Sequence, residues 1–414
     1  MLDQHSEPTR SILQAIEDHG PISFAEYMEL ALYGPNGFYE TPPVGEAGHF
    51  VTSPHVHPVF GRLLGDAIRA CWHELGRPNP LSIVEVGAGD GTLATQVTRA
   101  LADIPKRYVA IERSSGAREA LRRLPAPVEV SASLEAIGQH LDGVIIANEL
   151  LDNLPFRWAR RDERGDLHEV LIGVEEERLV TVPRPLRIND EEALATWPDS
   201  VPPGAEGPIP EGALHFVDRV ARMLHRGYAV MIDYAVERGS GIHGYRHQRV
   251  VDDVLHEPGT TDITGGVDFG VLADRAEALG LRSFGPVSQR SALLALGYER
   301  WAEDERRRQI EAQDRRSGRE AALAWSSRNA AAVLVDPGGL GALRWWVVAT
   351  PDMPDPGWVG EASARDLHDG EIAANTGIEG FMSFGDLRPR RLRWSRRWRM
   401  RAALRRSRRV WSPG

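Results

Sequence analysis

The fold is decided by the stretch LSIVEVGAGDGTL, residues 81–93. Its first six residues form a short apolar, β-branched run, which is typical of a buried parallel strand. Glycines alternate at Gly87, Gly89 and Gly91, and Thr92 then opens a helical pattern that continues to about Asp103. Glycine lets the backbone approach a ligand closely, and a helix N-terminus offers free N–H groups. The stretch therefore predicts a nucleotide-type binding turn between a strand and a helix.

The spacing of the glycines narrows the choice of ligand. A dinucleotide turn requires G-x-G-x-x-G, but Thr92 stands at the third glycine, and a Walker A loop requires a lysine that is absent. What remains is an acid, Glu85, two positions before G-x-G-x-G, the pattern of class I S-adenosylmethionine methyltransferases. This cofactor carries an amino group and a sulfonium, which favour the carboxylates that Glu85 and Asp90 supply. On the glycines alone, an ordinary tight turn stays open as the alternative.

Composition indicates a globular protein of ordinary kind. The chain has 414 residues, 42% hydrophobic and 26% charged, which suggests two domains or one domain with large insertions. Cys71 is the one cysteine, so a disulfide framework is excluded and a reducing compartment is favoured. The first residues do not read as a signal peptide, and no apolar run has the length of a membrane span. We expect a cytoplasmic protein without a transmembrane segment.

Charge is distributed unevenly along the chain. The net charge is -10, yet residues 387–414 hold twelve arginines and no acidic residue, so the rest carries about -22. The arginines of this tail alternate with Trp394, Trp398 and Trp411, which could bind RNA, an acidic protein or an anionic membrane surface. A disordered, solubilising extension is the alternative. The acidic remainder could suit a cationic substrate.

Strands alternate with helices along most of the chain, which predicts a doubly wound parallel α/β sheet of the Rossmann-like class I methyltransferase type. The expected strands are 81–86, 107–112, 128–130, 143–147, 228–234 and 344–349, and the main expected helices are 8–32, 59–75, 92–103, 114–124, 212–225 and 267–279.

The expected domains follow from this pattern. They are an N-terminal helical substrate or cap region (1–75), a cofactor-binding core (76–155 and 212–290), a β-hairpin and loop insertion (156–211), a helical subdomain (291–334), a final core strand (335–350) and an arginine-rich flexible tail (351–414).

Polar residues after two of the expected strands complete the expected catalytic site. Glu112 follows the second strand, where a carboxylate can bind both ribose hydroxyls of the adenosine. Asn148, Glu149 and Asp152 follow the fourth strand, whose neighbour is the first, so their loop should face the methyl group of the cofactor. Asn148 can also contact the cofactor. If the acceptor is an arginine, paired carboxylates would hold its guanidinium and polarise one nitrogen. Helix capping is the alternative role.

Two further segments supply candidate substrate ligands. Thr52 and Ser53 precede a helix that either residue could cap. Tyr245, Arg246 and Asp262 lie in a long loop, 237–266, where a surface loop with an Arg246–Asp262 ion pair is the alternative. No metal site is expected, because no cysteine or carboxylate at ligand spacing accompanies the three histidines His49, His55 and His57.

Several blocks resemble the MidA-type S-adenosylmethionine-dependent methyltransferases, a family that includes the mitochondrial complex I assembly factor that methylates arginine. The blocks are GHFVTSPHV (48–56), VEVGAGDGTL (84–93), ANELLDNLP (147–155), MIDYA (231–235), GYR, PGTTDIT and VDF within 244–269, and GPVSQRSALLALG (285–297). The resemblance covers about residues 20–349. It implies a Rossmann-like core with a second, mostly helical domain, S-adenosylmethionine as cofactor, and a protein arginine as acceptor, in a target like a complex I subunit.

The chain departs from this family in its first block. His49, His55 and His57 stand where the family has Asp, Glu and Ser. This puts the identity of the acceptor in doubt. The alternatives are a catalytically silent assembly or binding protein of a respiratory complex, and a methyltransferase that acts on a small molecule or RNA. The oligomeric state is not predicted.

Overall fold

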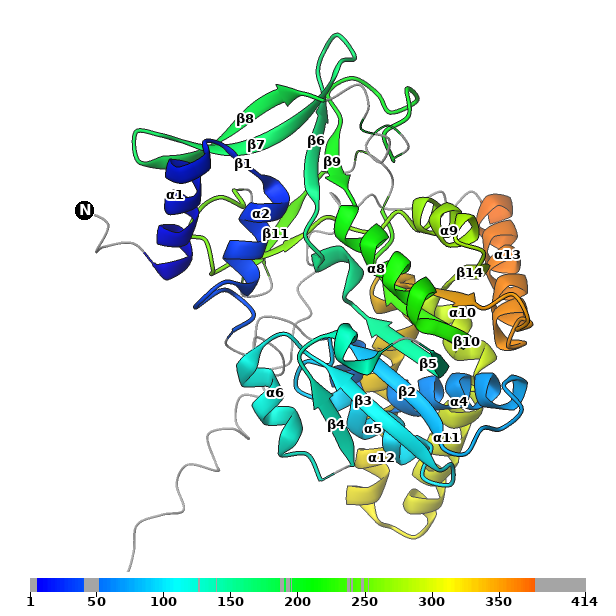
Figure 1. Ribbon diagram of the computed structural model, residues 1–414. Coiled ribbons are helices and arrows are strands. Elements are labelled where there is room, and N and C mark those ends of the chain that lie inside the picture. The colour runs from blue at the N-terminus through cyan, green and yellow to red at the C-terminus, as the bar shows by residue number, and fades with distance from the viewer. Residues whose placement is uncertain are drawn as a thin grey trace, which may run out of the picture. The chain divides into compact units, whose positions relative to one another are not determined.

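A seven-stranded sheet forms the centre of the computed structural model (Figure 1), in the order β14-β15-β10-β5-β2-β3-β4. β10, β5, β2, β3 and β4 are parallel neighbours, and β15 runs antiparallel between β10 and β14. The strands are β2 (Leu81–Val86), β3 (Lys106–Ile111), β4 (Val128–Ser131), β5 (Leu141–Asn148), β10 (Leu224–Asp233), β14 (Arg282–Ser288) and β15 (Arg344–Ala349). The α/β class and the parallel sheet predicted from the sequence are confirmed.

The structure describes residues 6–40, 52–125, 127–138, 140–186, 190, 194, 196–236, 239, 241–246, 249–251 and 253–376. The chain divides into two units, Met1–Asp366 and Leu367–Gly414, and the elements of the candidate site belong to the first.

Helices cover both faces of the central sheet, which explains why its strands are almost continuously apolar. On β2, Leu81 and Ile83 pack on the side of α4 and α5, whereas Val84 and Val86 pack on the side of α8 and α9. The helices around the sheet are α4 (Val59–Glu74), α5 (Thr92–Ala100), α6 (Ser115–Arg122), α8 (Glu211–Met223), α9 (Phe269–Ala278), α10 (Gln289–Ala295), α11 (Tyr298–Asp314), α12 (Gly318–Ala331) and α13 (Trp358–Thr376), with the four-residue α3 (Ser53–Val56) before α4.

A second layer of structure joins the N-terminal segment to the insertion after β5. α1 (Glu7–His19) begins at a Ser6 cap and is followed by β1 (Ile22–Ser23), α2 (Phe24–Met28) and a π-helical turn (Glu29–Tyr33). β1 extends an antiparallel sheet of β6 (Arg157–Arg161), β7 (Leu167–Glu175), β8 (Arg178–Pro185) and β9 (Glu206–Ile209). Phe24, Tyr27 and Trp158 lie in the shared apolar core. We call this part the cap lobe.

A small third sheet packs into the cap lobe. It consists of β11 (His243–Arg246), β12 (Arg249–Val251) and β13 (Asp262–Thr264), in the order β12-β11-β13. Ile263 is buried in the same apolar cluster as Phe24, and the hydroxyl of Tyr27 donates to the Val254 carbonyl at 2.7 Å. The long loop expected at 237–266 therefore contains strands, whose pairing partners are distant in sequence and leave little local pattern.

Two predicted boundaries differ from the structure, and one core strand was not predicted. α4 packs on the central sheet, with Phe60 and Leu63 fully buried, so the cap region ends before it and not at residue 75. β14 is a core strand that the sequence did not indicate. Order does not end at residue 350, since Trp358 and Val359 begin α13 inside the core and are 6% and 1% exposed. The apolar side chains of Trp358 and Val359 are buried by packing in the core cluster of the central sheet.

The expected helical portion is present and lies partly in the N-terminal segment and partly in α11 and α12. The N-terminal helices pack on the antiparallel sheet of the cap lobe, while α11 and α12 contact the central core through Trp301 and Ala331.

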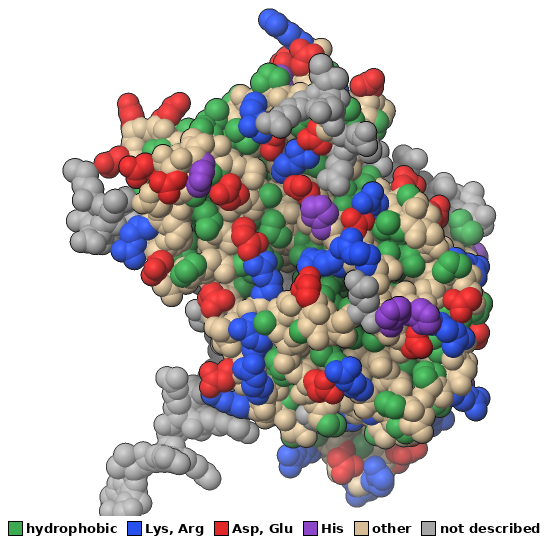
Figure 2. Space-filling model, in the orientation of Figure 1, with side chains coloured by type: hydrophobic (Ala, Val, Ile, Leu, Met, Phe, Trp, Pro, Cys, Tyr) green, Lys and Arg blue, Asp and Glu red, His purple; other side chains and the backbone are tan. Residues whose placement is uncertain are grey.

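Acidic and basic side chains are interspersed over the face in Figure 2, with acidic ones gathered at the tip of the β7–β8 hairpin, where Glu175, Glu176 and Glu177 are exposed. The tail 387–414 and its predicted partners lie outside the described residues.

Candidate active site

The glycine turn after β2 has the backbone that its sequence predicts. Gly87, Gly89 and Gly91 have φ values of 74°, 54° and 79°, in the left-handed region where glycine is favoured. A Cβ on Gly91 would come within 2.5 Å of the Leu124 side chain, and one on Gly87 within 3.0 Å of Leu150. A Cβ on Gly89 would meet nothing within 4 Å. The turn is thus closely packed at its ends and open at its middle, where a ligand can approach.

Glu112 ties the end of β3 to this turn. Its two carboxylate oxygens accept hydrogen bonds from the amides of Gly89 and Ser114, each at 2.8 Å. The carboxylate is therefore held beside the open middle of the turn. Its predicted bond to ribose hydroxyls stays a prediction that this position supports.

Asp90 is held from two sides. One oxygen accepts from the Thr92 amide at 2.9 Å, and the other lies 3.0 Å from Nε2 of His55. Burial alone would raise the pKa of Asp90, but the hydrogen bonds from His55 and Thr92 outweigh it and lower the pKa. Asp90 therefore offers a negative charge at the turn, and its contact with the amino group of the cofactor stays a prediction.

Glu85 lies inside the sheet and not on the surface of the turn. It is 3% exposed, and the hydroxyl of Tyr108 donates to it at 2.6 Å. Burial raises the pKa of Glu85 to about 8, against the opposing hydrogen bond from Tyr108. We therefore expect Glu85 to support the turn from within, and its predicted contact with the cofactor stays a prediction.

The loop after β5 presents Glu149 in an uncommon conformation. Its φ is 51°, which is rare for a residue with a side chain and often marks a functional position. The Glu149 carboxylate accepts from the Ser53 amide at 3.2 Å and from the Asn148 side chain at 3.3 Å. Burial raises the pKa of Glu149 to about 7. The group can therefore take up or release a proton near neutral pH.

Asp233, at the end of β10, holds this loop in place. It is fully buried, and one of its oxygens accepts from the amides of Leu150 at 3.0 Å and Leu151 at 2.6 Å. Burial raises the pKa of Asp233 to about 6, while these and neighbouring backbone hydrogen bonds oppose the rise. Sequence reasoning placed this acid in a strand and missed its role; its position at the carboxyl end of a core strand was the available signal.

Two buried oxygens of the same loop have no partner in the described part of the chain. They are Oδ1 of Asn148 and Oδ1 of Asp152. Asp152 is 7% exposed, and burial followed by the charges of Asp233 and Asp262 raises its pKa well above the usual value. Buried polar atoms are seldom left unbonded, so these two are available to a ligand.

Ser53 is anchored to the core behind the site. Its hydroxyl donates to Oε1 of Gln289 at 3.2 Å, and Gln289 also bonds Trp345 and the Leu334 carbonyl. Ser53 and Gln289 are both fully buried. The backbone amide of Ser53 is thereby positioned for Glu149. Gln289 was not predicted, because its contact with Ser53 joins segments 236 residues apart in the sequence.

The Thr52 hydroxyl does not cap α3. It lies 2.8 Å from Nδ1 of His55, whose other nitrogen contacts Asp90. Thr52 therefore acts through the histidine on the glycine turn. No group of three or more His, Cys, Asp or Glu side chains suited to a metal occurs among the described residues. His57 bonds Ser327 instead, and His49 lies outside those residues.

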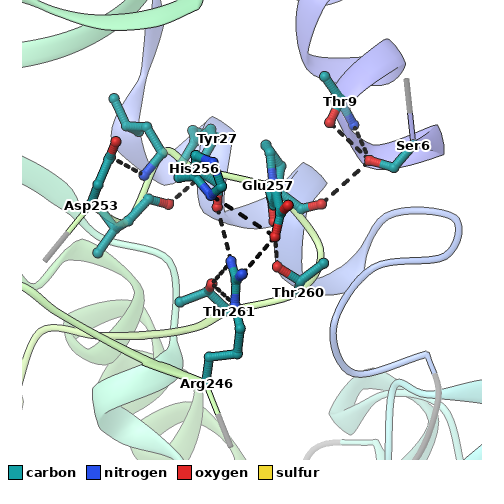
Figure 3. Close-up of polar contacts among 12 residues, drawn as sticks. Ser6, Thr9, Tyr27, Arg246, Asp253, His256, Glu257, Thr260 and Thr261 are labelled. Atoms are coloured by element: carbon teal, nitrogen blue, oxygen red, sulfur yellow. Dashed lines mark hydrogen bonds and ion pairs between the residues drawn. The ribbon is translucent and has the colours of Figure 1, made fainter. Parts of the chain in front are cut away.

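Arg246 forms hydrogen bonds within its own loop, as Figure 3 shows. Its guanidinium donates to Glu257 at 2.6 Å, to the His256 carbonyl at 3.2 Å and to the Thr261 hydroxyl at 2.9 Å. The suggested Arg246–Asp262 ion pair is therefore wrong. With its donors engaged in this way, we interpret Arg246 as an organiser of the loop, and its predicted substrate contact stays a prediction.

Asp262 joins a different group of residues. One oxygen accepts from the hydroxyl of Tyr39 at 2.6 Å and from the Asn153 side chain at 3.0 Å. Tyr245 stands directly opposite Asp262 in the β11–β13 ladder. Burial raises the pKa of Asp262 to about 7. Asp262 and Tyr245 therefore lie on the side of the site formed by the cap lobe.

The comparison with protein families agrees with this geometry. The family described as "Putative S-adenosyl-L-methionine-dependent methyltransferase" matches residues 63–287, more than half of the chain. The chain belongs to this family. The match spans the glycine turn, the Glu149 loop and Asp262.

Individual relatives of this methyltransferase carry more specific names. It is 28% identical over 324 residues to the mitochondrial protein arginine methyltransferase NDUFAF7 of Xenopus tropicalis, covering 69% of this chain and 74% of that protein. The human protein of the same name is 25% identical over 338 residues, covering 70% and 73%.

A solved structure is similar over almost its whole length. It is a COG1565 superfamily member from Burkholderia thailandensis bound to S-adenosyl-homocysteine, 25% identical, with a TM-score of 0.73 that covers 85% of this chain and 94% of that one. The cofactor predicted from the glycine spacing is thus confirmed as S-adenosylmethionine, and the enzyme class as a methyltransferase.

The residues of this methyltransferase fit such a cofactor. The open space over Gly89, the charged Asp90 and the Glu112 carboxylate lie together at the ends of β2 and β3. Leu150 of the Glu149 loop packs beside Gly87, which brings the two predicted parts of the site together. Asn148, Glu149 and Asp152 thus lie next to the turn, whereas Tyr245 and Asp262 approach from the cap lobe.

Proposed function

We propose that this methyltransferase transfers a methyl group to an arginine side chain of a protein. The observation that carries the proposal is Glu149, a half-buried carboxylate with a left-handed backbone and a pKa of about 7, next to the glycine turn. A guanidinium is positively charged at all physiological pH values and matches carboxylate geometry. The names of the relatives, which are protein arginine methyltransferases, support the same acceptor.

The chemistry requires few groups. When bound, S-adenosylmethionine supplies an electrophilic methyl group. Glu149 would hold the guanidinium by a charge-assisted hydrogen bond and accept the proton that the attacking nitrogen loses. The unpartnered Oδ1 of Asn148 would accept a second guanidinium N–H and fix the orientation of the plane. Alignment of this kind supplies most of the rate enhancement in a direct displacement.

The acceptor can be identified by comparing the proteins of cells with and without this chain by mass spectrometry. We expect at least one methylarginine that is present with the wild-type chain and lost both in its absence and with Glu149→Gln. A change confined to methyllysine, to RNA or to small molecules would overturn the proposal. A target like a complex I subunit is a narrower prediction, which the same comparison addresses.

We retain two sequence-based predictions as proposals. One is a cytoplasmic location, which differs from the mitochondrial location in the names of the relatives and which fractionation of cells checks. The other is a binding role for the arginine-rich tail. Deletion of residues 387–414 tests this role by the loss of a co-purified partner.

No helix in the described part of the chain combines the length and apolarity of a membrane span.

A further inference from the structure

A second acidic group lies beyond Glu149, between the Glu149 loop and the cap lobe. It consists of Asp152 and Asp262, which are 7% and 4% exposed. Asn153, the residue after Asp152, donates to Asp262 at 3.0 Å, so the two acids are neighbours. Burial raises the pKa of Asp152, and the charges of Asp233, Asp262 and Glu149 raise it further.

No cation in the described part of the chain compensates these acids. Neither Asp152 nor Asp262 forms an ion pair with a described Arg, Lys or His, although other buried acids such as Glu169 pair with arginine. Asp262 receives hydrogen bonds from Tyr39 and Asn153, whereas Oδ1 of Asp152 receives none from any described residue. The other oxygen of Asp152 shares a hydrogen bond with Asp233, and burial together with the charges of Asp233 and Asp262 raises the pKa of Asp152. A cation bound at the free Oδ1 would favour the charged form of this carboxyl group.

Aromatic rings from the cap lobe stand beside this acidic pair. Tyr39 donates to Asp262 and stacks on Tyr33 with ring centroids 5.4 Å apart. The Tyr33 ring already carries the guanidinium of Arg113, 4.3 Å from its centroid. Rings of this kind attract a planar cation through their faces. Tyr245 stands opposite Asp262 in the β11–β13 ladder, and burial followed by the charges of Asp152 and Asp262 raises its pKa.

We propose that Asp152, Asp262 and Tyr39 form a subsite that binds the acceptor guanidinium and selects arginine over lysine. The inference rests on the proposed function. A guanidinium has five N–H donors in one plane, so it can bond Glu149 and still donate to Asp152 and Asp262. The ammonium of lysine is a compact point charge that cannot span separated carboxylates in this way. Tyr39 orients Asp262 from the cap lobe and makes that lobe part of acceptor recognition.

The test measures binding to the full chain with S-adenosyl-homocysteine present, so that no turnover is needed. The probes are N-acetyl-arginine methylamide and N-acetyl-lysine methylamide, titrated by ligand-observed NMR, which reads millimolar Kd values. We expect the arginine probe to bind at least about tenfold more tightly than the lysine probe, as bidentate charge-assisted bonds imply. Equal binding of the two probes would overturn the subsite.

Single substitutions test which residues of the subsite bind the arginine probe. Asp152→Asn and Asp262→Asn should each weaken the arginine probe about tenfold or more, because each removes a charge-assisted hydrogen bond. Tyr39→Phe keeps both charges and the ring, and should weaken it about threefold, which provides a reading if an acid variant does not fold. Asp253→Asn, an exposed acid in the same region, is the matched control and should bind as wild type.

The failure of this inference differs from that of the proposed function. If Asp152→Asn and Asp262→Asn bind the arginine probe like wild type while Glu149→Gln loses methylation, the subsite is wrong and the arginine acceptor stands. If wild type does not bind the arginine probe at all, the subsite is overturned and the arginine acceptor loses support as well.

Discussion

At the scale of single residues, Glu149 combines three properties that a proton acceptor needs. Its left-handed backbone directs the side chain, the Ser53 amide holds one oxygen, and burial raises its pKa to about 7. A base with a pKa near the working pH is an effective one. Asp90, with a lowered pKa, carries charge but would be a weak base.

Activity should therefore fall as the pH decreases through about 7, because protonated Glu149 cannot accept a proton or bind a cation through charge. We expect Glu149→Gln to lower kcat about a hundredfold or more and to remove this limb of the pH profile, with little change in the Kd of S-adenosylmethionine. Rates across the acid and neutral range and calorimetry check both parts. A variant that retains the limb would show that another group titrates.

At the scale of elements, the short helix α3 is held by hydrogen bonds to two different parts of the site. Ser53 bonds Gln289 in α10, while His55 bonds Asp90 in the glycine turn. Two parts of the site are thus held by one four-residue helix. The resemblance implies Glu at the position of His55. In this chain His55 bonds Asp90 and so helps to hold the glycine turn.

Loss of the Ser53 hydroxyl should loosen the amide that bonds Glu149. That hydrogen bond lowers the pKa of Glu149, so in Ser53→Ala we expect the acid limb of the rate profile to move up by about half to one pH unit. Ser327→Ala removes a hydroxyl that bonds His57 and not Ser53, and serves as the control. Identical profiles for the two variants would contradict the anchoring role.

Local pattern explains which parts of the structure the sequence predicted. The strands Leu81–Val86 and Arg344–Ala349 are apolar runs and were predicted with these bounds, and Glu149 follows such a strand. β14 contains Gly285 and Pro286 and is held by pairing with β15, so its own residues indicate little. Asp233, Gln289 and Tyr39 act through contacts between distant segments, which a single sequence does not reveal.

At the scale of the whole molecule, the acids gathered in the site lower the stability of the folded state at neutral pH. Burial raises the pKa values of Glu85 to about 8, of Glu149 and Asp262 to about 7, and of Asp233 to about 6. In the unfolded chain such groups titrate near about 4. The folded state therefore binds more protons than the unfolded state between about pH 4 and 8, and loses stability as the pH rises through that range.

Thermal unfolding without ligand should show this directly. We expect Tm to fall from about pH 5 to about pH 8, and S-adenosyl-homocysteine to raise it at the upper end of that range. Exposed acids with lowered pKa values, such as Glu129, act in the opposite sense but are screened by solvent. Glu85→Gln should make the decline shallower, because it removes one of the raised groups. A Tm that rises steadily over the same range would contradict the raised pKa values of these buried acids.

The central claim, methyl transfer to arginine with Glu149 as the acceptor-binding base, is tested most directly with purified protein. The measurement incubates the chain and S-adenosylmethionine carrying a labelled methyl group with proteins from cells that lack the chain, then identifies the labelled residue by mass spectrometry. The account predicts labelled methylarginine, formed together with S-adenosyl-homocysteine and absent with Glu149→Gln. Label on a residue other than arginine, or undiminished labelling by Glu149→Gln, would contradict it.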